Sequence, residues 1–187
     1  MYFSKRRTQT LGDYSPQQTD VVLAELPPGP GGAAATLRYM RDFVQEAIRD
    51  PGQSIRNKAL DLVSGLPPRQ WMAEIRALHA FVKDQIRYVR DPVGLELVQS
   101  PDKTIEIAQG DCDDKATLLA ALLTATGHPA RFIAVGFNGD PLSHVLVQTK
   151  VDSTGIDSKD WVSLETIIDR PVGWFPPDVT SKYILKV

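Results

Sequence analysis

Hydrophobic positions in the first half of the chain recur every three or four residues, which is the spacing of amphipathic helices. The pattern predicts helices over residues 36–50 and 54–64 and a third helix that begins near Arg69. Thr36 is the expected N-cap of the first of these helices. His79 lies beside the apolar stripe of the third helix, so we expect it to be a half-buried structural residue.

The second half of the chain contains one more helix and then a series of strands. The segment after Gly110 is apolar almost all round and stops at Gly127, which predicts a central, buried helix. Beyond it the hydrophobic period changes to two, the period of strands. Because helices come first and strands follow, we expect an α+β fold with an antiparallel sheet packed on the central helix. The expected strands cover residues 131–137, 144–150, 161–166 and 183–187.

The first 33 residues differ in composition from the rest of the chain. They are polar as far as Asp20, continue with Val21-Val22-Leu23, and end in a run rich in proline and glycine. We therefore predict an N-terminal arm and linker over residues 1–33 and a single domain with a helical lead-in over residues 34–187. Arms of this composition often bind a neighbour, so we expect this one to contact a partner or a second copy of the chain.

Composition and charge restrict the partners of the protein. Its 187 residues include 21 Lys and Arg and 23 Asp and Glu, so the net charge is −2, which argues against nucleic acids and anionic membranes as partners. The longest apolar stretch, 116–125, is far shorter than the roughly 20 residues of a membrane helix. No apolar run follows Lys5-Arg6-Arg7, so we expect no secretory signal and a cytoplasmic location, with association with a virion as an alternative.

Cys112 is the only cysteine, which excludes an intramolecular disulfide and a multi-cysteine zinc site. It falls in the first turn of the predicted central helix, where unpaired N–H groups and the helix dipole stabilise a thiolate or an oxyanion. Asp111, Asp113 and Asp114 act in the opposite direction, since their negative charges raise the pKa of a thiol. Lys115 offsets them only in part, so a nearby imidazolium must supply much of the activation.

His144 is the candidate for that imidazole, because it leads a predicted strand. The next strand carries Glu165, and a symmetric hairpin centred between Thr154 and Gly155 would place this acid directly opposite His144. A carboxylate in that position would orient the imidazole toward the thiol. The sequence therefore predicts a nucleophile, a base and an orienting acid in the order Cys112, His144 and Glu165.

Several motifs resemble those of the transglutaminase-like superfamily, and together they cover about residues 70–168. Residues 110–123 (GDCDDKATLLAALL) and 127–131 (GHPAR) are similar to its active-site helix. Residues 143–147 (SHVLV) look like its histidine strand, and residues 161–165 (WVSLE) look like the strand that ends in its third catalytic residue. Upstream, residues 86–92 and 100–104 match its tyrosine-containing segment and the approach to the cysteine.

The resemblance implies a papain-like α+β fold with Cys112 as nucleophile, His144 as general base and Glu165 as the orienting residue. Two features depart from the family pattern: the third residue is usually Asp, and the aromatic residue that often follows the histidine region is absent here. The acidic run is also similar to that of calcium-regulated bacterial cysteine proteases. Asp111 and Asp113 are therefore candidate Ca²⁺ ligands, although acids are common at helix starts without any cofactor.

The leading hypothesis is a thiol-dependent hydrolase that cleaves an amide bond in a protein or peptide through an acyl-enzyme. Transfer of the acyl group to a primary amine and a non-catalytic assembly module, related to phages or prophages, are the alternatives. A metal-dependent hydrolase is disfavoured, because the chain has three histidines and no pair of them has i, i+4 spacing on one helix. Gln99 and Gln109 are upstream candidates for a second oxyanion donor.

Overall fold

The computed structural model describes residues 20–24, 30–92, 96–139, 142–151 and 161–187. The chain forms a mixed α+β fold in which helices dominate the first part and strands the second. The elements in chain order are β1 (Val21–Ala24), α1 (Pro30–Arg49), α2 (Ser54–Val63), α3 (Trp71–Gln85), β2 (Arg87–Tyr88), β3 (Glu96–Gln99), α4 (Pro101–Ile107), β4 (Gln109–Gly110), α5 (Cys112–Ala125), β5 (Ala130–Phe137), β6 (His144–Thr149), β7 (Val162–Leu164) and β8 (Val179–Lys186).

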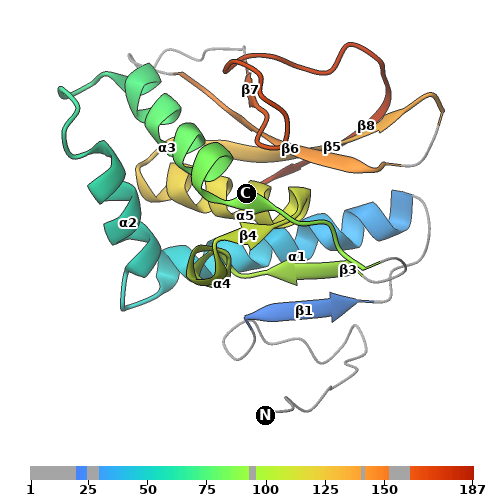
Figure 1. Cartoon of the computed structure of the whole chain (residues 1–187), viewed down its shortest axis with the longest axis horizontal. Helices are drawn as coiled ribbons and strands as arrows, with labels where there is room; N and C mark the ends of the chain where they lie inside the picture. Colours follow the sequence, from blue (N-terminus) through green and yellow to red (C-terminus); the bar gives the residue numbers. More distant parts are fainter. Residues whose placement is uncertain (1–19, 25–29, 93–95, 140–141, 152–160) are drawn as a thin grey trace.

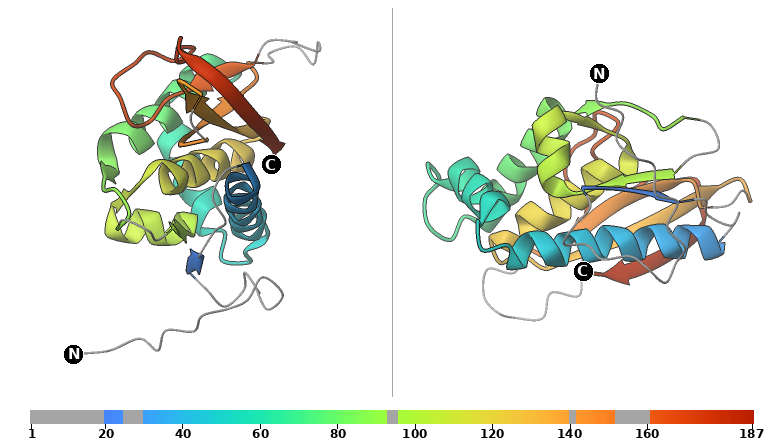
Figure 2. Two further views of the ribbon diagram at one scale, coloured as in Figure 1. Left: turned by 90° about the vertical axis from the view of Figure 1, so that its right-hand side faces the viewer. Right: turned by 90° about the horizontal axis from the view of Figure 1, so that it is seen from below.

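The main sheet has four strands in the order β7-β6-β5-β8, and every neighbouring pair is antiparallel. Helix α5 lies between this sheet and α1, while α2 and α3 cover one end of the layers (Figures 1 and 2). Two smaller pairings complete the fold: β1 pairs with β3, and β2 runs parallel to β4, just before α5. This architecture is the predicted antiparallel sheet on a central helix.

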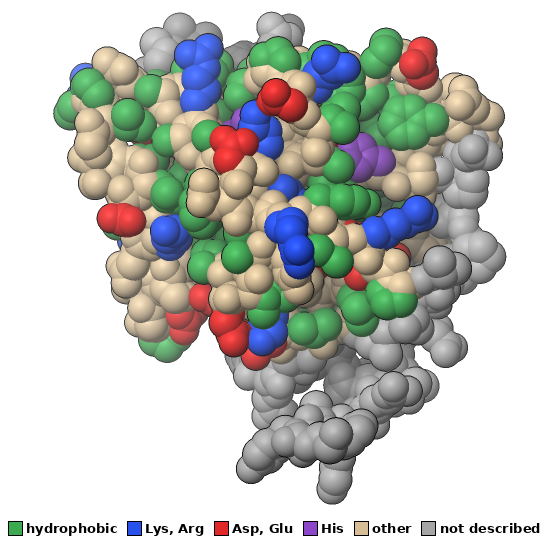
Figure 3. Space-filling view, in the orientation of Figure 1, with side chains coloured by type: hydrophobic (Ala, Val, Ile, Leu, Met, Phe, Trp, Pro, Cys, Tyr) green, Lys and Arg blue, Asp and Glu red, His purple; other side chains and the backbone are tan. Residues whose placement is uncertain are grey.

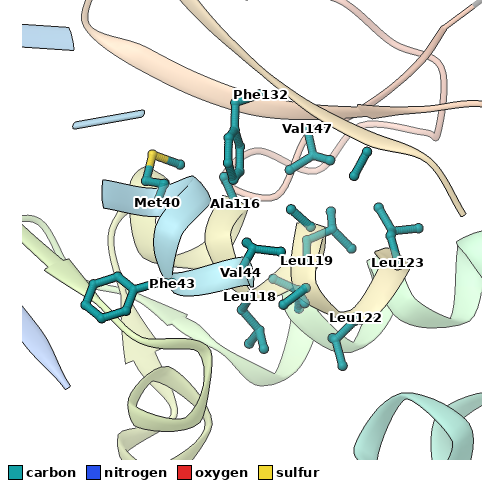
Figure 4. Close-up of a cluster of buried hydrophobic side chains, with 14 of the residues drawn as sticks. Met40, Phe43, Val44, Ala116, Leu118, Leu119, Leu122, Leu123, Phe132 and Val147 are labelled. Atoms are coloured by element: carbon teal, nitrogen blue, oxygen red, sulfur yellow. The ribbon is translucent and has the colours of Figure 1, made fainter. Parts of the chain in front are cut away.

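The core forms around α5 because this helix has apolar side chains on every side. Leu118, Leu119, Leu122 and Leu123 have no solvent exposure, and they meet side chains from both neighbouring layers. Figure 4 shows this cluster between α1 and the sheet, with Met40, Phe43 and Val44 from α1 and Phe132 and Val147 from β5 and β6. Truncating one of these leucines to alanine typically costs about 2–5 kcal/mol, so this contact fixes the helix firmly beneath the sheet.

Helix α1 begins at Pro30, six residues before the predicted cap at Thr36. Proline is well suited to the first turn of a helix, because the N–H that it lacks would have no partner there. The hydroxyl of Thr36 donates instead to the carbonyl of Gly32, one turn earlier in the same helix (3.3 Å). The division into an arm over 1–33 and a domain over 34–187 stays a prediction, and residues 1–19 and 25–29 lie outside the described residues.

Two elements differ from the periodicity-based expectation. Helix α4 was not predicted, because seven residues are too few to show a helical repeat; Ser100 caps it by accepting the N–H of Lys103 (3.2 Å), and Pro101 opens it. Strand β8 begins at Val179 rather than at residue 183, and as an edge strand it exposes most of its side chains. Short or exposed elements carry little hydrophobic pattern, which is why the sequence shows them poorly.

The surface shows no segregation of charge on the face in Figure 3, where Lys and Arg side chains are interspersed with Asp, Glu and apolar ones. No helix among the described residues combines the length and the apolar character needed to cross a membrane.

Candidate active site

The start of α5 is fixed by its own acidic residues. Asp111 is the N-cap, and its Oδ1 accepts the N–H groups of Asp113 (2.9 Å) and Asp114 (3.3 Å), while Oδ2 of Asp114 accepts the N–H of Asp111 (3.2 Å). A Cβ at Gly110 would lie 2.5 Å from Cβ of Asp114, so a glycine is required there. The sequence Gly-Asp-Cys-Asp-Asp therefore places Cys112 as the first residue of the buried helix.

The two glutamines expected as oxyanion donors have other partners. The side-chain amide and the backbone N–H of Gln99 both donate to Asp114 (2.6 and 2.8 Å), which joins β3 to the start of α5. Gln109 accepts a hydrogen bond from the guanidinium of Arg87 across the β2–β4 pair (2.7 Å). Both residues thus support the segment around the cysteine.

Cys112 as a residue is half-buried, and its sulfur lies at the start of β6. It accepts a hydrogen bond from the backbone N–H of Val145, the residue after His144, and its S–H donates to Oδ1 of Asp113 (3.4 Å). Burial, followed by the charges of Asp113 and Asp111, raises the pKa of the thiol well above its usual range, and the Val145 N–H opposes this only in part. The resting form is therefore the thiol, despite the position at a helix N-terminus.

Lys115 does not compensate the acids near the sulfur. Its side chain is 2 % exposed, and Nζ donates to the carbonyls of Ile86 (2.6 Å) and Lys83 (3.3 Å). These carbonyls lie at the end of α3, where a cation also interacts favourably with the helix dipole. Burial lowers the pKa of Lys115. This residue therefore joins α5 to α3.

His144 and Glu165 form the predicted pair, with Nε2 of the imidazole 2.8 Å from Oε2 of the carboxylate. The predicted register was nevertheless wrong by two residues. Val147 pairs with Leu164 and Gln148 with Ser163, so extending the ladder by one pair would place residue 146 opposite Glu165. A shift of two keeps every side chain on its original face, and His144 reaches Glu165 as a diagonal neighbour. The turn that sets the register, over 152–160, lies outside the described residues.

The carboxylate of Glu165 is surrounded by hydrogen-bond donors. It is 1 % exposed, and it accepts N–H groups of Ile167 (2.7 Å) and Ile168 in addition to the bond with His144. Burial alone would raise the pKa of Glu165, but the hydrogen bond and charge of His144 and the two N–H groups outweigh it and lower the pKa. The acid is therefore held as an anion, and the imidazole beside it stays 19 % exposed.

One contact of this acid has no counterpart in the sequence prediction. His79, on α3, places Nε2 2.5 Å from the backbone carbonyl of Glu165, and its side chain is 5 % exposed, more deeply buried than expected. The two residues are 86 positions apart, and no local pattern reports on such a contact. His128 pairs with Glu74 at the opposite end of α5 (3.0 Å) and lies away from the site.

The acids on the other side of the sulfur are buried beside one another, and the two N–H groups that Asp111 accepts do not outweigh this. Burial, followed by the charges of Asp114 and Asp91, raises the pKa of Asp111 to about 7. Burial, then the charge of Asp111, and then a hydrogen bond with Glu96 raise the pKa of Asp113 well above its usual range. Each acid thus makes it harder for the others to ionise.

These residues fit a calcium ion poorly. Ligand atoms of Asp111, Cys112 and Asp113 lie within 4.8 Å of one another, but one of the three is a thiol. Calcium prefers six to eight oxygen ligands, and one oxygen of Asp111 already accepts two backbone N–H groups. Asp113 shares a hydrogen bond with Glu96, as two carboxyl groups do around a proton. Calcium binding at Asp111 and Asp113 therefore remains a prediction that the geometry does not favour.

The chain belongs to the transglutaminase-like superfamily. The model of this family matches residues 56–179, a stretch that contains Cys112, His144 and Glu165. No curated protein matches the chain. The membership confirms the family that the motifs indicated.

Two solved structures have a similar fold. One is a "putative cysteine protease" from Cytophaga hutchinsonii, with 14 % identity and a TM-score of 0.51 over 87 % of this chain and 59 % of that chain. The other is a "putative protease" from Parabacteroides distasonis, with 17 % identity and a TM-score of 0.50 over 70 % of this chain and 29 % of that chain. The matched region is thus only part of each of those proteins, and at these identities the likeness concerns the fold.

Proposed function

We propose that this protein is a thiol-dependent hydrolase of amide bonds in proteins or peptides, with Cys112, His144 and Glu165 as its catalytic residues. The observation that carries the proposal is the hydrogen bond between His144 and a buried, ionised Glu165, formed where the Cys112 sulfur meets the N–H of Val145. A carboxylate on one imidazole nitrogen directs the other nitrogen toward a nucleophile, which is the arrangement that general-base catalysis needs.

The raised pKa of the thiol determines how the first step would proceed. Because the resting sulfur is protonated, Cys112 attacks the carbonyl carbon while its proton passes to Nδ1 of His144, and a tetrahedral intermediate forms. The N–H groups of Asp113 and Asp114 already bind Asp111, so the N–H of Cys112 itself is the helix donor that would stabilise the oxyanion.

The C–N bond then breaks as His144 gives its proton to the leaving amine, which leaves a thioester on Cys112. A water molecule attacks this thioester, His144 takes the proton of the water, and the acid product leaves with regeneration of the thiol. A primary amine in place of water would give amide exchange, which is the transglutaminase-type outcome. Hydrolysis is preferred because the two structures of similar fold are described as proteases.

The test is acyl-enzyme capture with a panel of peptide amides and peptide thioesters, followed by intact mass spectrometry, with and without a primary amine. We expect a covalent adduct on the wild type at Cys112, no adduct on Cys112→Ala, and a longer-lived adduct on His144→Ala when thioesters are used. Turnover without an amine indicates hydrolysis. A folded protein that forms no adduct with any substrate, or that forms an equal adduct on Cys112→Ala, would rule out the proposal.

A non-catalytic module is the second candidate, and the surroundings of the sulfur favour it. Two neighbouring acids raise the thiol pKa, whereas an efficient nucleophile normally has cationic neighbours. If the protein serves as an assembly module, Cys112→Ala should keep its biological activity in full. Loss of that activity in a folded Cys112→Ala protein would argue for the enzyme.

A further inference from the structure

Glu165 directly follows the last residue of β7 whose backbone is paired in the sheet. Strand β7 ends at Leu164, and the last ladder pair joins Leu164 to Val147, so the peptide group of Glu165 lies just beyond the paired region. A buried carbonyl in such a position needs another donor. The imidazole of His79 is that donor, and it comes from α3, a different layer of the fold.

The protonation of His79 follows from its partner. A carbonyl oxygen can only accept a hydrogen bond, so Nε2 of His79 must carry a proton. Burial lowers the pKa of His79, which keeps the ring neutral. Lys83, on the same helix, also lowers this pKa, whereas Asp84 on that helix and the charge of Glu165 raise it. A neutral ring is the form that can be buried here at small cost.

The two hydrogen bonds on Glu165 therefore act on different parts of one residue. His79 holds the backbone carbonyl, and His144 binds the carboxylate at the end of the side chain. A glutamate side chain has one more rotatable bond than an aspartate, so its carboxylate is placed well only when its backbone is fixed. The rigid helix α3 provides this anchor, since Ile75, Leu78 and Val82 on either side of His79 are completely buried.

We propose that His79 is a positioning residue, which sets the distance between Glu165 and His144 by holding the Glu165 carbonyl. This inference rests on the proposed function for its catalytic consequence, but the geometric claim can be tested without any substrate. A merely structural His79 would affect the stability of the fold and leave the His144–Glu165 hydrogen bond unchanged in folded molecules.

The first readout is the proton on Nε2 of His144, observed by NMR as a downfield signal and identified by its absence in His144→Ala. We expect His79→Leu to weaken or broaden this signal strongly. His79→Gln, whose amide can reach the same carbonyl, should retain it, and His79→Asn, whose amide is too short, should behave like His79→Leu. If His79→Leu does not fold, the comparison of Gln with Asn decides the matter.

The matched control is His128→Leu. Like His79, this residue is a buried histidine with one hydrogen-bond partner, here the carboxylate of Glu74, but it lies beyond the far end of α5, about 20 Å from the cysteine for a helix of this length. It should lose stability and keep the His144 signal. An unchanged signal in a folded His79→Leu or His79→Asn protein, or an equal loss in His128→Leu, would overturn the inference.

The second readout is kinetic and uses a substrate identified in the acyl-enzyme test. Partners that orient a metal-bound histidine typically contribute about 10–100-fold, and by analogy kcat of His79→Leu should fall about 10-fold with little change in KM, while His79→Gln should restore most of it. If the NMR signal changes as expected while the wild type hydrolyses no substrate, the positioning role stands and the proposed hydrolase does not. If the wild type is active and the signal is indifferent to His79, the reverse holds.

Discussion

Glu165 and Asp113 are two buried acids of the candidate site, and their surroundings shift their pKa values in opposite directions. Glu165 faces an imidazole and two backbone N–H groups, which lower its pKa in spite of burial. Asp113 faces Asp111 and Glu96, and after burial it is the charge of Asp111 and the hydrogen bond and charge of Glu96 that raise its pKa. Both side chains are buried, and their neighbours differ: hydrogen-bond donors surround Glu165, whereas other carboxyl groups surround Asp113.

The contrast shows that the two halves of the site differ in how far they are already arranged for the proposed catalysis. The half made by β6 and the end of β7 already holds its anion and orients its imidazole, which is the state that catalysis needs. The half made by the start of α5 uses its acids to cap the helix and to bind Gln99, and burial together with the charges of Asp113 and Asp111 keeps the sulfur protonated. In the proposed mechanism, activation of Cys112 therefore depends on His144.

The sharpest test of this contrast removes each acid in turn. Glu165→Ala leaves the N–H of Ile167 and the ring of His144 without their partner, and we expect activity to fall about 10³–10⁴-fold. Unfolding free energy should also fall by about 1–3 kcal/mol, since buried donors lose their acceptor. The measurements are kcat/KM and urea unfolding. Asp113→Ala should retain most of the activity, and equal losses in the two variants would contradict the comparison.

The next test concerns the sulfur. Asp113→Asn removes a charge that raises the thiol pKa, so the pH midpoint of alkylation by iodoacetamide should move to lower pH. The alkylation rate below that midpoint should rise accordingly, because only the thiolate reacts. Asp61→Asn, on an exposed position of α2, is the control for removing a charge and should leave the rate unchanged. An unaltered pH profile in Asp113→Asn would mean that this acid does not govern the thiol.

A smaller effect is expected in the pH dependence of stability. The pKa of Asp111 is raised to about 7 in the folded protein, so its contribution to stability is present below its unfolded pKa and is lost as the pH rises through 7. Asp111→Asn keeps a good N-cap and removes the charge. The stability that the variant gains over the wild type should therefore be larger at pH 8 than at pH 5. The expected difference is on the order of 1 kcal/mol, or roughly 2–4 °C in Tm.

Comparing the wild type with Asp111→Asn separates the effect of Asp111 on the pH dependence of stability from the effects of the other titrating groups. Burial lowers the pKa values of His79 and His128, so their contributions are lost as the pH falls, in the wild type and in the variant alike. The contribution of Glu165, whose pKa is lowered, disappears only at still more acidic pH. Parallel pH curves for the two proteins, measured by thermal unfolding, would show that Asp111 titrates in its ordinary range.

The smallest effect is expected from calcium. Since the acids around Cys112 are occupied by helix N–H groups and by each other, EDTA or millimolar Ca²⁺ should change activity by less than about twofold and Tm by less than about 2 °C. A calcium-dependent rise in Tm that disappears in Asp113→Asn would instead identify a metal site here and would reverse the interpretation of this half of the site.

The sequence predicted the central helix and the order of helices and strands, because these elements are long and their periodicity is strong. It also placed His144 and Glu165 on one face, although the predicted register was wrong by two residues. Because side chains alternate along a strand, an error of two residues leaves each side chain on its original face. Which two residues lie directly opposite each other depends instead on the turn, whose geometry the sequence does not specify. Helix α4 and the start of α1 were missed because short or proline-led segments lack a clear repeat.

The partners of the site residues were harder to predict than the residues themselves. The contact of His79 with Glu165 joins a helix to the end of a strand 86 residues later, and the bond of Gln99 to Asp114 depends on the path of the chain between β3 and α5. Both contacts arise from tertiary packing. The local sequence shows which chemical groups are present, but only the tertiary structure determines which group each of them contacts.

The buried amine of Lys115 can report how often helices α3 and α5 separate. With its ammonium group hydrogen-bonded to two carbonyls at the end of α3, this lysine is shielded from reagents that acylate amines. Exposed lysines such as Lys182 are modified in the native state, whereas Lys115 can react only after α3 has separated from α5. Its labelling rate, read by peptide mapping, therefore measures how often the two helices part.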